Sequence, residues 1–190
     1  MNILIVAATN SEVTSVRDTN NTLLITGIGM VNTTLYLTKE LINKSYDLVI
    51  NMGVAGCFHN AFKKGDVVEV VEDCFSELGF EDGEFFSDFP DLKVKYINKA
   101  RTSFRKVTGI TVNTVHGNRD SIKAITERLD VDIESMEGAS VFKVCQQFNV
   151  PCIQIRSISN IVEERNKEKW NIPLAIKNLS VELNKIIAAL

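Results

Sequence analysis

Short apolar runs alternate along the chain with longer segments in which apolar residues recur at helical spacing. The short runs predict strands at 2–8, 22–28, 47–52, 65–71, 110–115 and 152–159. The longer segments predict helices at 30–44, 93–105, 119–129, 136–148 and 173–190. Because repeated strand–helix alternation is typical of a mostly parallel sheet covered on both faces, we expect an α/β fold with three α/β/α layers. The length of 190 residues predicts one domain over residues 1–190.

Residues 75–90 interrupt this alternation. The segment is rich in Gly, acidic residues and Phe, and its apolar positions have no clean period. Long connections of this kind are uncommon in compact domains and often carry function. We therefore expect a long excursion or lid here.

Composition and charge limit the classes of partner. The chain is 45% hydrophobic and has a formal net charge of −3, with both signs mixed along its length. Nucleic-acid binders usually concentrate Lys and Arg on one face, so we expect no nucleic-acid partner. No stretch approaches the roughly 20 apolar residues of a membrane span, and the N-terminal run predicts a buried strand rather than a signal peptide. The expectation is a cytoplasmic protein with no membrane partner.

The cysteine and histidine pattern predicts neither disulfides nor a metal site. Cys57, Cys74, Cys145 and Cys152 form no CxxC pair. Free cysteines usually behave as small core residues, and disulfides are rare in the cytoplasm, so we expect reduced and buried thiols. The two histidines lie far apart in the sequence and near no Cys cluster, which argues against structural zinc.

Polar residues follow several predicted strands, at the sheet edge where open α/β folds bind ligands. Glu12 follows the first strand, and Glu137 lies where a short apolar strand becomes a helix. Asn160 ends the strand predicted at 152–159. Each also has a purely structural interpretation. Carboxylates complement helix N-termini, and Asn is common in turns. The pattern alone leaves both interpretations open.

A second set of charged residues lies close to these positions. Glu134 falls in the strand just before Glu137, and an ionised carboxylate buried there would need a ligand or a charged partner. Arg156 lies in the strand before Asn160, and an internal ion-pair partner is a more common role for it than a substrate clamp. His116 follows a strand end and is a weak candidate for contacting a ligand.

Two glycine-containing segments follow strands. Gly27-Ile-Gly29 and Gly53-Val-Ala-Gly56 are expected to be small-residue turns, which allow a ligand to approach the backbone or permit tight strand-to-helix packing. Neither is a GxGxxG fingerprint, and no Walker lysine is present. A dinucleotide or P-loop site is therefore disfavoured.

Six motifs occur along the chain in a characteristic order: Glu12-Val13, Gly27-Ile-Gly29, Asn51-Met-Gly-Val-Ala-Gly56, Gly65-Asp66-Val67, Ser135-Met-Glu-Gly138 and Arg156-Ser-Ile-Ser-Asn160. Together they resemble the nucleoside phosphorylase and nucleosidase superfamily over nearly the whole chain. The resemblance implies a nucleoside phosphorylase-like fold. A narrower resemblance, to the futalosine hydrolases of menaquinone biosynthesis, rests on Glu134-Ser-Met-Glu-Gly-Ala139, on Ser159-Asn160 and on residues 166–178.

The resemblance implies roles for specific residues. In related methylthioadenosine/adenosylhomocysteine nucleosidases an acidic residue after the first strand activates water, and Glu12 matches it. A Met-Glu pair holds the ribose, and Met136 and Glu137 match it. An Asp after Ser protonates the purine at N7, but here Asn160 follows Ser159. An amide cannot pass on a proton, so Asn160 instead suits hydrogen bonding to N7 and O6 of a departing base such as hypoxanthine. An Asn can also bind adenine, by donating to N7 and accepting from the 6-amino group.

Other implied contacts are apolar or come from small residues. Gly53, Val54 and Val115 are expected to line the substrate site. Phe85 or Phe86 either covers the substrate or belongs to a dimer interface or a satellite core. Residues 14–22 leave little room for a hairpin, which affects contacts to the 5′ group. Arg119, Lys123 and Arg165 are candidates for binding a carboxylate there, although each is more commonly a solvated charge.

Hydrolysis is the implied reaction. The resembling phosphorylases bring an Arg to phosphate before the glycine-rich segment, but Asn51-Met52 stands there, and Glu12 would repel a phosphate while suiting an attacking water. The implied activity is N-ribosyl hydrolysis of futalosine, which releases hypoxanthine and dehypoxanthine futalosine. No cofactor is implied; the partners are a small nucleoside substrate and a second copy in a homodimer. The alternatives are a methylthioadenosine/adenosylhomocysteine nucleosidase, a purine nucleoside phosphorylase or a non-catalytic nucleoside-binding protein.

Overall fold

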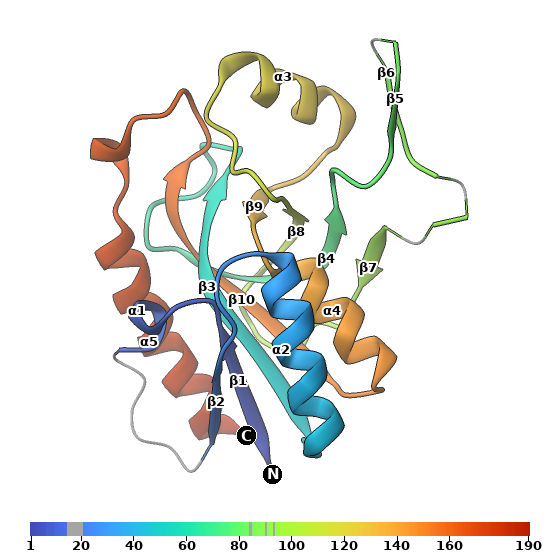
Figure 1. Ribbon diagram of the computed structural model, residues 1–190. Coiled ribbons are helices and arrows are strands. Elements are labelled where there is room, and N and C mark those ends of the chain that lie inside the picture. Colours follow the sequence, from blue (N-terminus) through green and yellow to red (C-terminus); the bar gives the residue numbers. More distant parts are fainter. Residues whose placement is uncertain (15–20, 84, 90, 93) are drawn as a thin grey trace.

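Figure 1 shows the chain as a computed structural model, which describes residues 1–14, 21–83, 85–89, 91–92 and 94–190. The strands are β1 (Ile3–Ala7), β2 (Thr22–Ile25), β3 (Leu48–Cys57), β4 (Val67–Phe75), β5 (Phe80–Asp82), β6 (Phe85–Ser87), β7 (Lys95–Ile97), β8 (Arg105–Thr111), β9 (Ile133–Ser135) and β10 (Cys152–Ile161). The helices are α1 (Asn10–Val13), α2 (Met30–Asn43), α3 (Arg119–Arg128), α4 (Gly138–Gln147) and α5 (Ile172–Ala189), with a 3-10 turn at Lys167–Lys169. Most of the expected short link at 14–22 lies outside the described residues.

Eight strands form one mixed sheet in the order β10-β4-β8-β9-β3-β1-β2, with β7 beside β4. Because β10 also pairs with β3, the strands β3, β10, β4, β8 and β9 form a closed ring from which β1 and β2 extend. Within this sheet, as far as its residues are described, β10–β4, β3–β9 and β4–β7 are antiparallel and the other pairs are parallel. The expected mostly parallel sheet is thus only partly right. Residues 58–66 contain no helix and are too short for a parallel crossover, so β4 returns antiparallel.

Helices cover the sheet on two sides, which confirms the expected layers. The helix α2 packs on α4, which contacts β3, β4, β7, β8 and β10 (Figure 1). On the other side α5 packs on β3, β4 and β10 and contacts α1. Each side has its own buried cluster, one around Phe142 and Leu37 and the other around Ile155 and Leu179. The sheet therefore separates two apolar layers, and its strand ends remain available for a site.

The predicted apolar stripe of α2 is only partly buried. Leu37 and Leu41 are buried against the core, as their spacing predicts. Val31, Leu35 and Ile42 point away from it, with 74%, 59% and 68% of their surface exposed. The helix therefore presents an apolar face that the chain itself does not cover.

The prediction of a helix at 93–105 is wrong. The strand β7 occupies Lys95–Ile97 and pairs with the edge of β4, and β8 begins at Arg105. Tyr96 is buried, whereas Lys95 and Ile97 are exposed, which is the period-two pattern of a strand. The backbone between the two strands is held by Glu69, whose carboxylate accepts hydrogen bonds from Arg101 N and Thr102 N.

Three predicted strand ends also differ from the structure. Gly53 and Gly56 are not in a turn, because β3 continues through them to Cys57. The strand expected at 110–115 begins earlier and ends at Thr111. The strand β10 continues to Ile161, two residues beyond the expected end, so Asn160 lies inside it, where a register shift interrupts the pairing with β3. In contrast, Gly27 and Gly29 do form the turn before α2, with φ angles of 85° and 95°.

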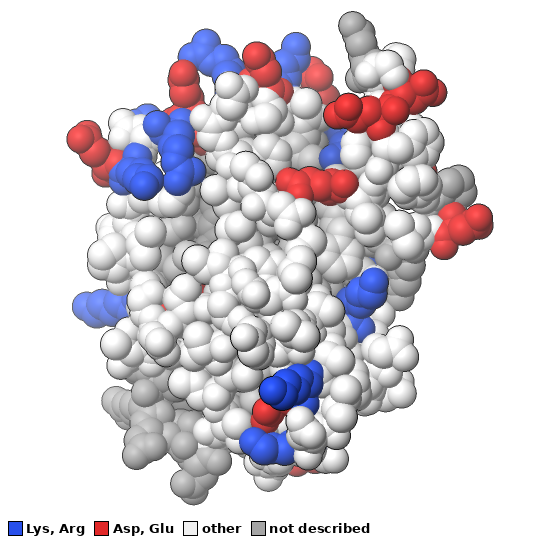
Figure 2. Space-filling view, in the orientation of Figure 1, with Lys and Arg blue, Asp and Glu red and all other residues white. Residues whose placement is uncertain are grey.

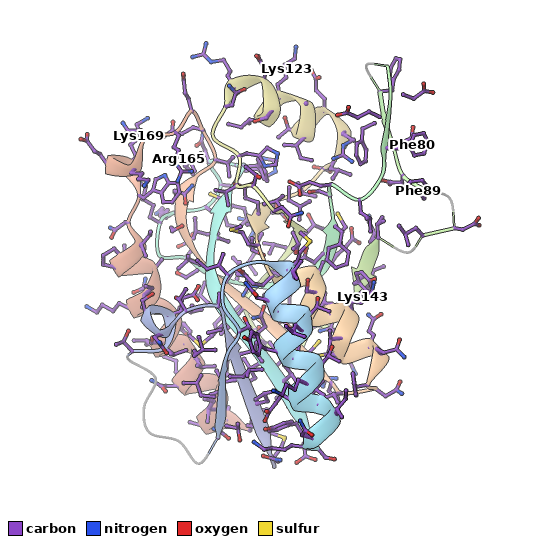
Figure 3. The ribbon with its side chains drawn as sticks, viewed as in Figure 1. Phe80, Phe89, Lys123, Lys143, Arg165 and Lys169 are labelled. Carbon is purple, nitrogen blue, oxygen red and sulfur yellow. The ribbon has the colours of Figure 1, made fainter. Side chains whose placement is uncertain are left out.

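The excursion expected at 75–90 is a small hairpin. The strands β5 and β6 pair with each other and project beyond the main sheet (Figure 1). Phe80 packs on Phe89 at 5.2 Å between ring centroids, and both lie in this projecting region (Figure 3). Phe86 lies under the guanidinium of Arg128, 3.9 Å from its ring centroid. Phe80 and Phe89 thus pack on each other and Phe86 packs against α3, whereas Phe85 is 76% exposed.

The remaining expectations about composition can be compared with the structure. All four cysteines are free and buried, which confirms the predicted reduced thiols. In the described chain, none of the helices has the length and hydropathy needed to cross a membrane.

Candidate active site

A cavity of about 340 Å³ opens at the carboxyl ends of β1, β3 and β10, beside the start of α4. Ala8 at the end of β1, Val54 in β3 and Ser159 in β10 line it. Its ionisable side chains include Glu12, Glu134, Glu137 and His116. The fold therefore gathers into one cavity most of the candidates that the sequence placed at separate strand ends.

Glu12 is 8% exposed and lies in the one-turn helix α1. Its Oε2 atom accepts hydrogen bonds from the backbone N of Thr9 at 3.0 Å and from the Thr9 hydroxyl at 3.1 Å. Its Oε1 atom lies 3.3 Å from the backbone N of Val54, which donates to it. The helix-terminal role and the cavity-facing role of Glu12, which the sequence left as alternatives, are thus combined in one side chain.

Glu137 occupies the N-cap position of α4. Its Oε1 atom accepts a hydrogen bond from the backbone N of Gly29 at 2.9 Å, which joins the turn before α2 to the start of α4. Burial raises the pKa of Glu137, and the charge of Arg156 opposes that increase. The Glu137 side chain lines the cavity, where it can accept a hydrogen bond from a ligand hydroxyl.

Arg156 lies beneath the two carboxylates and is 1% exposed. Its Nη2 atom donates to Asn51 Oδ1 at 2.6 Å, and its Nη1 atom donates to the carbonyl of Ile155 at 3.2 Å. Burial lowers its pKa, while the negative charges of Glu137 and Glu12 favour the charged form. Arg156 is therefore internal, as expected, but the described residues give it no ion pair, and the negative charges of Glu137 and Glu12 act on it at longer range.

Gly53 makes this arrangement possible. A Cβ atom added to Gly53 would lie 3.0 Å from Glu12 Oε1 and 3.2 Å from Arg156 Nη1. Any larger residue would therefore push on both charged groups. Gly53 does not itself line the cavity, contrary to expectation. It contributes to the site by leaving space for the side chains of Glu12 and Arg156.

The amide of Asn160 has a fixed orientation. Its Oδ1 atom accepts a hydrogen bond from the Ser159 hydroxyl at 2.7 Å, and its Nδ2 atom donates to the carbonyl of Ile161 at 3.0 Å. A carboxamide nitrogen has two N–H groups, so one donor remains for a ligand. The Ser159 hydroxyl also contacts the carbonyl of Ala55, which fixes Asn160 to β3.

Glu134 is paired with His116. It is 3% exposed, and its Oε2 atom lies 2.6 Å from His116 Nδ1. The backbone N of His116 also donates to both carboxylate oxygens, at 3.1 and 3.3 Å. Both side chains line the cavity, as does Asn160. One of the two neighbouring glutamates is expected to have a ligand or a charged partner, and His116 is a partner of Glu134 that is charged only when its ring is protonated.

The rim of the cavity comes from the segment before α5. The guanidinium of Arg165 lies over the Trp170 ring, 5.0 Å from its centroid, and both residues line the cavity. Figure 3 shows Arg165 and Lys169 on the same side of the molecule, below α3 and Lys123. Of the three cations considered for a 5′ carboxylate, Arg119 and Lys123 pair with Glu164 and Glu127 at the surface, so only Arg165 borders the cavity.

The other predicted contact residues divide into two groups. Met136, Val54 and Val115 line the cavity, whereas Phe85 and Phe86 line a separate hollow beside α3. The structure adds apolar walls that sequence reasoning did not single out: Ile28, Trp170, Ile172 and Ile176. Three of these fall within residues 166–178, the segment that carried the narrower resemblance. These three residues could have been found from the sequence, because they follow β10, whose end borders the predicted site.

The donor set offers no metal site. No group of three or more His, Cys, Asp or Glu side chains in the described ranges is arranged to hold an ion. The carboxylates of the cavity instead accept hydrogen bonds from backbone N–H groups or contact His116. Glu12 and Glu137 also interact electrostatically with Arg156.

Sequence comparisons identify relatives of the whole domain. The family model of the phosphorylase superfamily matches residues 12–188. The chain is 27% identical over 180 residues to the futalosine hydrolase of Thermus thermophilus, covering 87% of this chain and 80% of that protein. It is 32% identical over 160 residues to the 5′-methylthioadenosine/S-adenosylhomocysteine nucleosidase of Anoxybacillus flavithermus, covering 75% of this chain and 68% of that protein.

Solved structures share the fold. The futalosine hydrolase of Helicobacter pylori strain 26695 matches with a TM-score of 0.88 and 17% identity, covering 100% of this chain and 98% of that one. The 5′-methylthioadenosine/S-adenosylhomocysteine nucleosidase of the same organism also has a TM-score of 0.88 and 17% identity, over 100% and 99%. At such identities these matches show the nucleoside phosphorylase-like fold alone. The match over residues 12–188, together with the 32% identical relative, shows that the chain belongs to the phosphorylase superfamily, an enzyme family.

Proposed function

We propose that this protein hydrolyses the N-ribosidic bond of futalosine, releasing hypoxanthine and dehypoxanthine futalosine for menaquinone biosynthesis in the cytoplasm. The observation that carries the proposal is the shared cavity of Glu12, Glu137 and Asn160. A carboxylate for water, a carboxylate for ribose hydroxyls and an amide donor for the base are the groups that this hydrolysis requires. Similarity to the futalosine hydrolase of Thermus thermophilus supports the choice of substrate.

Each group has a defined part in the proposed reaction. Glu12 takes a proton from the water that attacks C1′, a general-base step typically worth about 10²–10⁴-fold in rate. Glu137 accepts hydrogen bonds from the ribose hydroxyls and places negative charge near the oxocarbenium-like centre. Asn160 donates its remaining N–H to an acceptor on the purine. Met136, Val54 and Val115 supply apolar walls.

Water suits this cavity better than phosphate as the attacking group. The Glu12 carboxylate lies 3.3 Å from the backbone N of Val54, and the Arg156 guanidinium is buried and already bonded to Asn51. A phosphate beside Glu12 would meet like charge, which is repulsive at short range. The phosphorylase alternative is accordingly disfavoured.

A methylthioadenosine/adenosylhomocysteine nucleosidase is the second candidate, and the 32% identical relative favours it. Asn160 favours futalosine, because its free N–H can donate to either N7 or O6 of a 6-oxopurine, whereas adenine offers it N7 alone. A non-catalytic nucleoside-binding protein would not need Glu12 at the cavity. These differences make the leaving base the decisive product.

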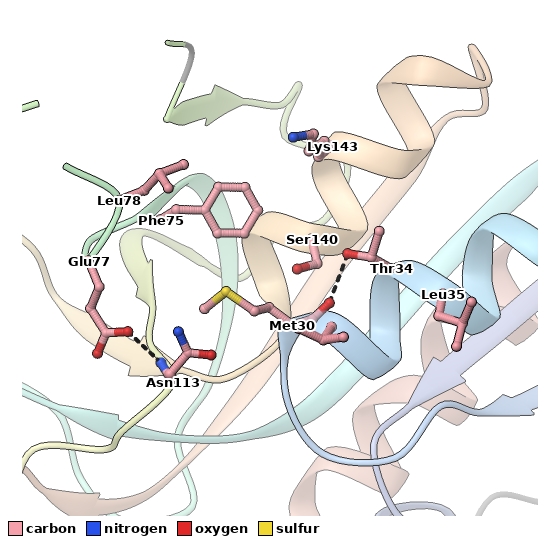
Figure 4. Close-up of a pocket in the computed structure, with 10 residues that line it drawn as sticks. Met30, Thr34, Leu35, Phe75, Glu77, Leu78, Asn113, Ser140 and Lys143 are labelled. Atoms are coloured by element: carbon pink, nitrogen blue, oxygen red, sulfur yellow. Dashed lines mark hydrogen bonds between the residues drawn. The ribbon is translucent and has the colours of Figure 1, made fainter. Parts of the chain in front are cut away.

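The proposed enzyme is a homodimer joined through α2. Figure 2 shows a face over α2 whose centre is free of charged side chains. A second cavity of about 520 Å³ lies there between α2 and α4, lined by Met30, Leu35, Phe75 and Leu78 among others (Figure 4). Exposed apolar patches of this kind mark interaction sites, and a second copy of the same face is a self-complementary occupant.

Product analysis in phosphate-free buffer tests the proposal. Purified protein is incubated with futalosine, methylthioadenosine or inosine, and released bases are separated by chromatography. We expect hypoxanthine from futalosine and little from inosine, because the 5′ group contributes binding. Adenine from methylthioadenosine as the sole product would assign the second candidate instead. If the base were released only after phosphate was added, the reaction would be phosphorolysis and not hydrolysis.

A further inference from the structure

The departing purine needs more than Asn160 can supply. When the C1′–N9 bond breaks, its electron pair stays on the base, and the negative charge has to be neutralised. The amide of Asn160 can donate one hydrogen bond but cannot give up a proton. A group that carries a transferable proton at the same end of the cavity would complete the reaction.

His116 and Glu134 form a pair at that end. A Cβ atom added to Gly56 would lie 3.2 Å from Asn160 Nδ2 and 3.6 Å from Glu134 Cγ, so both side chains approach one point of β3. His116 lies 2.6 Å from Glu134 through Nδ1 and lines the same cavity. The pair is therefore beside the amide that faces the base.

The geometry of the ring leaves one nitrogen free. Nδ1 is bonded to Glu134, and the ring edge packs against Phe58 at 6.2 Å between centroids. Nε2 has no hydrogen bond to any residue in the described part of the chain. A carboxylate that binds one ring nitrogen fixes the orientation of the other, as in the histidine pairs of known catalytic sites. Nε2 is thus the atom available to a ligand.

Carboxylates predominate among the charged groups around the ring. Glu134 is 3% exposed, and His116 is its only ion-pair partner among the described residues. An isolated buried carboxylate is costly, so a cationic partner stabilises it. Beyond Glu134, the two cavities that border the ring contribute Glu12, Glu137 and Arg165 on one side, and Glu77, Glu81, Glu127 and Arg128 on the other. Most of these groups are carboxylates, whose negative charge attracts a cation.

The water-activating group lies at the opposite end. Val54 N contacts Glu12, and Gly53 is packed against Glu12, whereas Gly56 is packed against Glu134 and Asn160. Glu12 and the His116–Glu134 pair thus approach β3 at different residues, while all three side chains line the same cavity.

We propose that His116, held by Glu134, is the acid that protonates the leaving purine in the hydrolysis proposed above. The C1′–N9 bond breaks with its electron pair on the base, and Nε2 of His116 gives a proton to a ring nitrogen of the purine. The water oxygen bonds to C1′ and loses its proton to Glu12. After the products leave, solvent carries that proton from Glu12 to His116, so one water is consumed and no other reactant is needed.

Steady-state kinetics of matched variants test the role. His116→Gln should lower kcat by about 10²–10⁴-fold with a much smaller change in KM, because the proton is needed in the transition state. His59→Gln, at the other and exposed histidine, should leave both constants unchanged. Glu134→Gln keeps an acceptor for Nδ1 but removes the charge, and should lower kcat at least about tenfold with KM preserved. If a smaller folded fraction fully accounts for the loss of kcat in His116→Gln, the proposal is overturned. A kcat for His116→Gln within about threefold of wild type would overturn it as well.

Nuclear magnetic resonance of the unmodified chain tests the same point without a variant in the site. The chain has two histidines, so long-range proton–nitrogen spectra are assigned by comparison with His59→Gln. We expect both ring nitrogens of His116 to carry protons near neutral pH, and added hypoxanthine to shift Nε2 of His116 but not the ring of His59. An unprotonated Nε2, or one that hypoxanthine leaves unchanged, would overturn the proposal even if the His116→Gln chain did not fold.

The two proposals can fail separately. If wild type cleaves methylthioadenosine or inosine instead of futalosine, the substrate proposal fails, and the same variants are then assayed on the nucleoside that is cleaved. If wild type cleaves futalosine while His116→Gln retains its kcat, the substrate proposal stands and the acid is not His116.

Discussion

Glu12 has two carboxylate oxygens with different surroundings. Oε2 is held by Thr9, whereas Oε1 faces the cavity beside the backbone of Val54. Glu12→Gln keeps the size and most hydrogen bonds of the side chain but removes its basicity. We expect kcat for nucleoside hydrolysis to fall by about 10²–10⁴-fold, while calorimetry shows substrate affinity within about threefold of wild type.

Glu182→Gln is the matched control for this variant, because Glu182 pairs with Lys185 on α5 and does not line the cavity. Its kinetic constants should equal those of wild type. Unchanged turnover in Glu12→Gln would remove Glu12 from the mechanism, and loss of affinity without loss of kcat would make it a binding residue.

Asp73 is fully buried beside the start of α4. It accepts hydrogen bonds from Thr111 and Gln154, at 2.9 and 3.1 Å, but burial raises its pKa to about 6 from 3.8. Because the folded-state pKa is the higher one, the folded chain binds the proton more tightly than the unfolded chain. Ionisation of Asp73 therefore costs stability as the pH rises from about 4 to 6, and the full cost of roughly 3 kcal/mol is present above that range.

Asp73→Asn should remove this cost. We expect urea denaturation to show a higher free energy of unfolding than wild type at about pH 7, by up to roughly 3 kcal/mol, with the difference shrinking toward about pH 4. The amide can also donate to Gln154 Oε1, a buried atom without a partner in the described chain. Asp130→Asn at an exposed site provides the comparison, and a pH-independent difference for Asp73→Asn would contradict the linkage.

At the scale of single elements, β3 brings the two halves of the site together. The space at Gly53 admits Glu12 and Arg156 on the strand's surface. Gly53→Ala would place a Cβ atom 3.0 Å from Glu12 Oε1, so the carboxylate has to move away from its position. We expect kcat to fall about tenfold or more, because a displacement of this size misaligns the attacking water.

Gly109→Ala is the matched control, since Gly109 lies in the buried strand β8 outside the cavity. Its added Cβ atom would be similarly crowded, at 3.2 Å from Val70 Cγ1. Thermal denaturation should show comparable losses of stability for both variants, but kcat of Gly109→Ala should stay within about twofold of wild type. Equal effects of both variants on kcat would indicate that Gly53 acts only through stability.

Prediction of individual elements from the sequence depended on how strongly the local pattern was constrained. The helix α4 was predicted well because Val141, Val144 and Cys145 repeat at helical spacing and all three are buried. The strand β7 was missed because three residues provide too short a pattern, and its state is fixed by pairing with β4. Gly53 and Gly56 suggested a turn because glycine is common there, whereas the strand keeps them to make space for charged side chains.

At the scale of the whole molecule, the uncovered face of α2 predicts self-association. Leu35 and Val31 are exposed on this face and lie beside the cavity between α2 and α4. Leu35→Glu would introduce a charge into the apolar centre of the interface, where desolvation is unfavourable. We expect sedimentation velocity to show a dimer for wild type and a shift toward monomer for Leu35→Glu.

Val181→Glu on α5 is the control for this experiment, because Val181 is also an exposed apolar residue but lies in a helix on the other side of the sheet. This variant should remain dimeric. A monomeric wild-type chain at all concentrations would contradict the proposed homodimer, and dissociation by Val181→Glu but not by Leu35→Glu would place the interface elsewhere.

The sequence by itself determined the α/β class, most helices and the family, because these depend on local periodicity and on motifs that remain contiguous. It also identified Glu12, Glu137 and Asn160, since polar residues at strand ends are local features. Only the tertiary structure decided that the sheet is mixed and that His116 pairs with Glu134. Strand direction and charge pairing depend on which distant segments become neighbours, and burial then sets how strongly those charges interact.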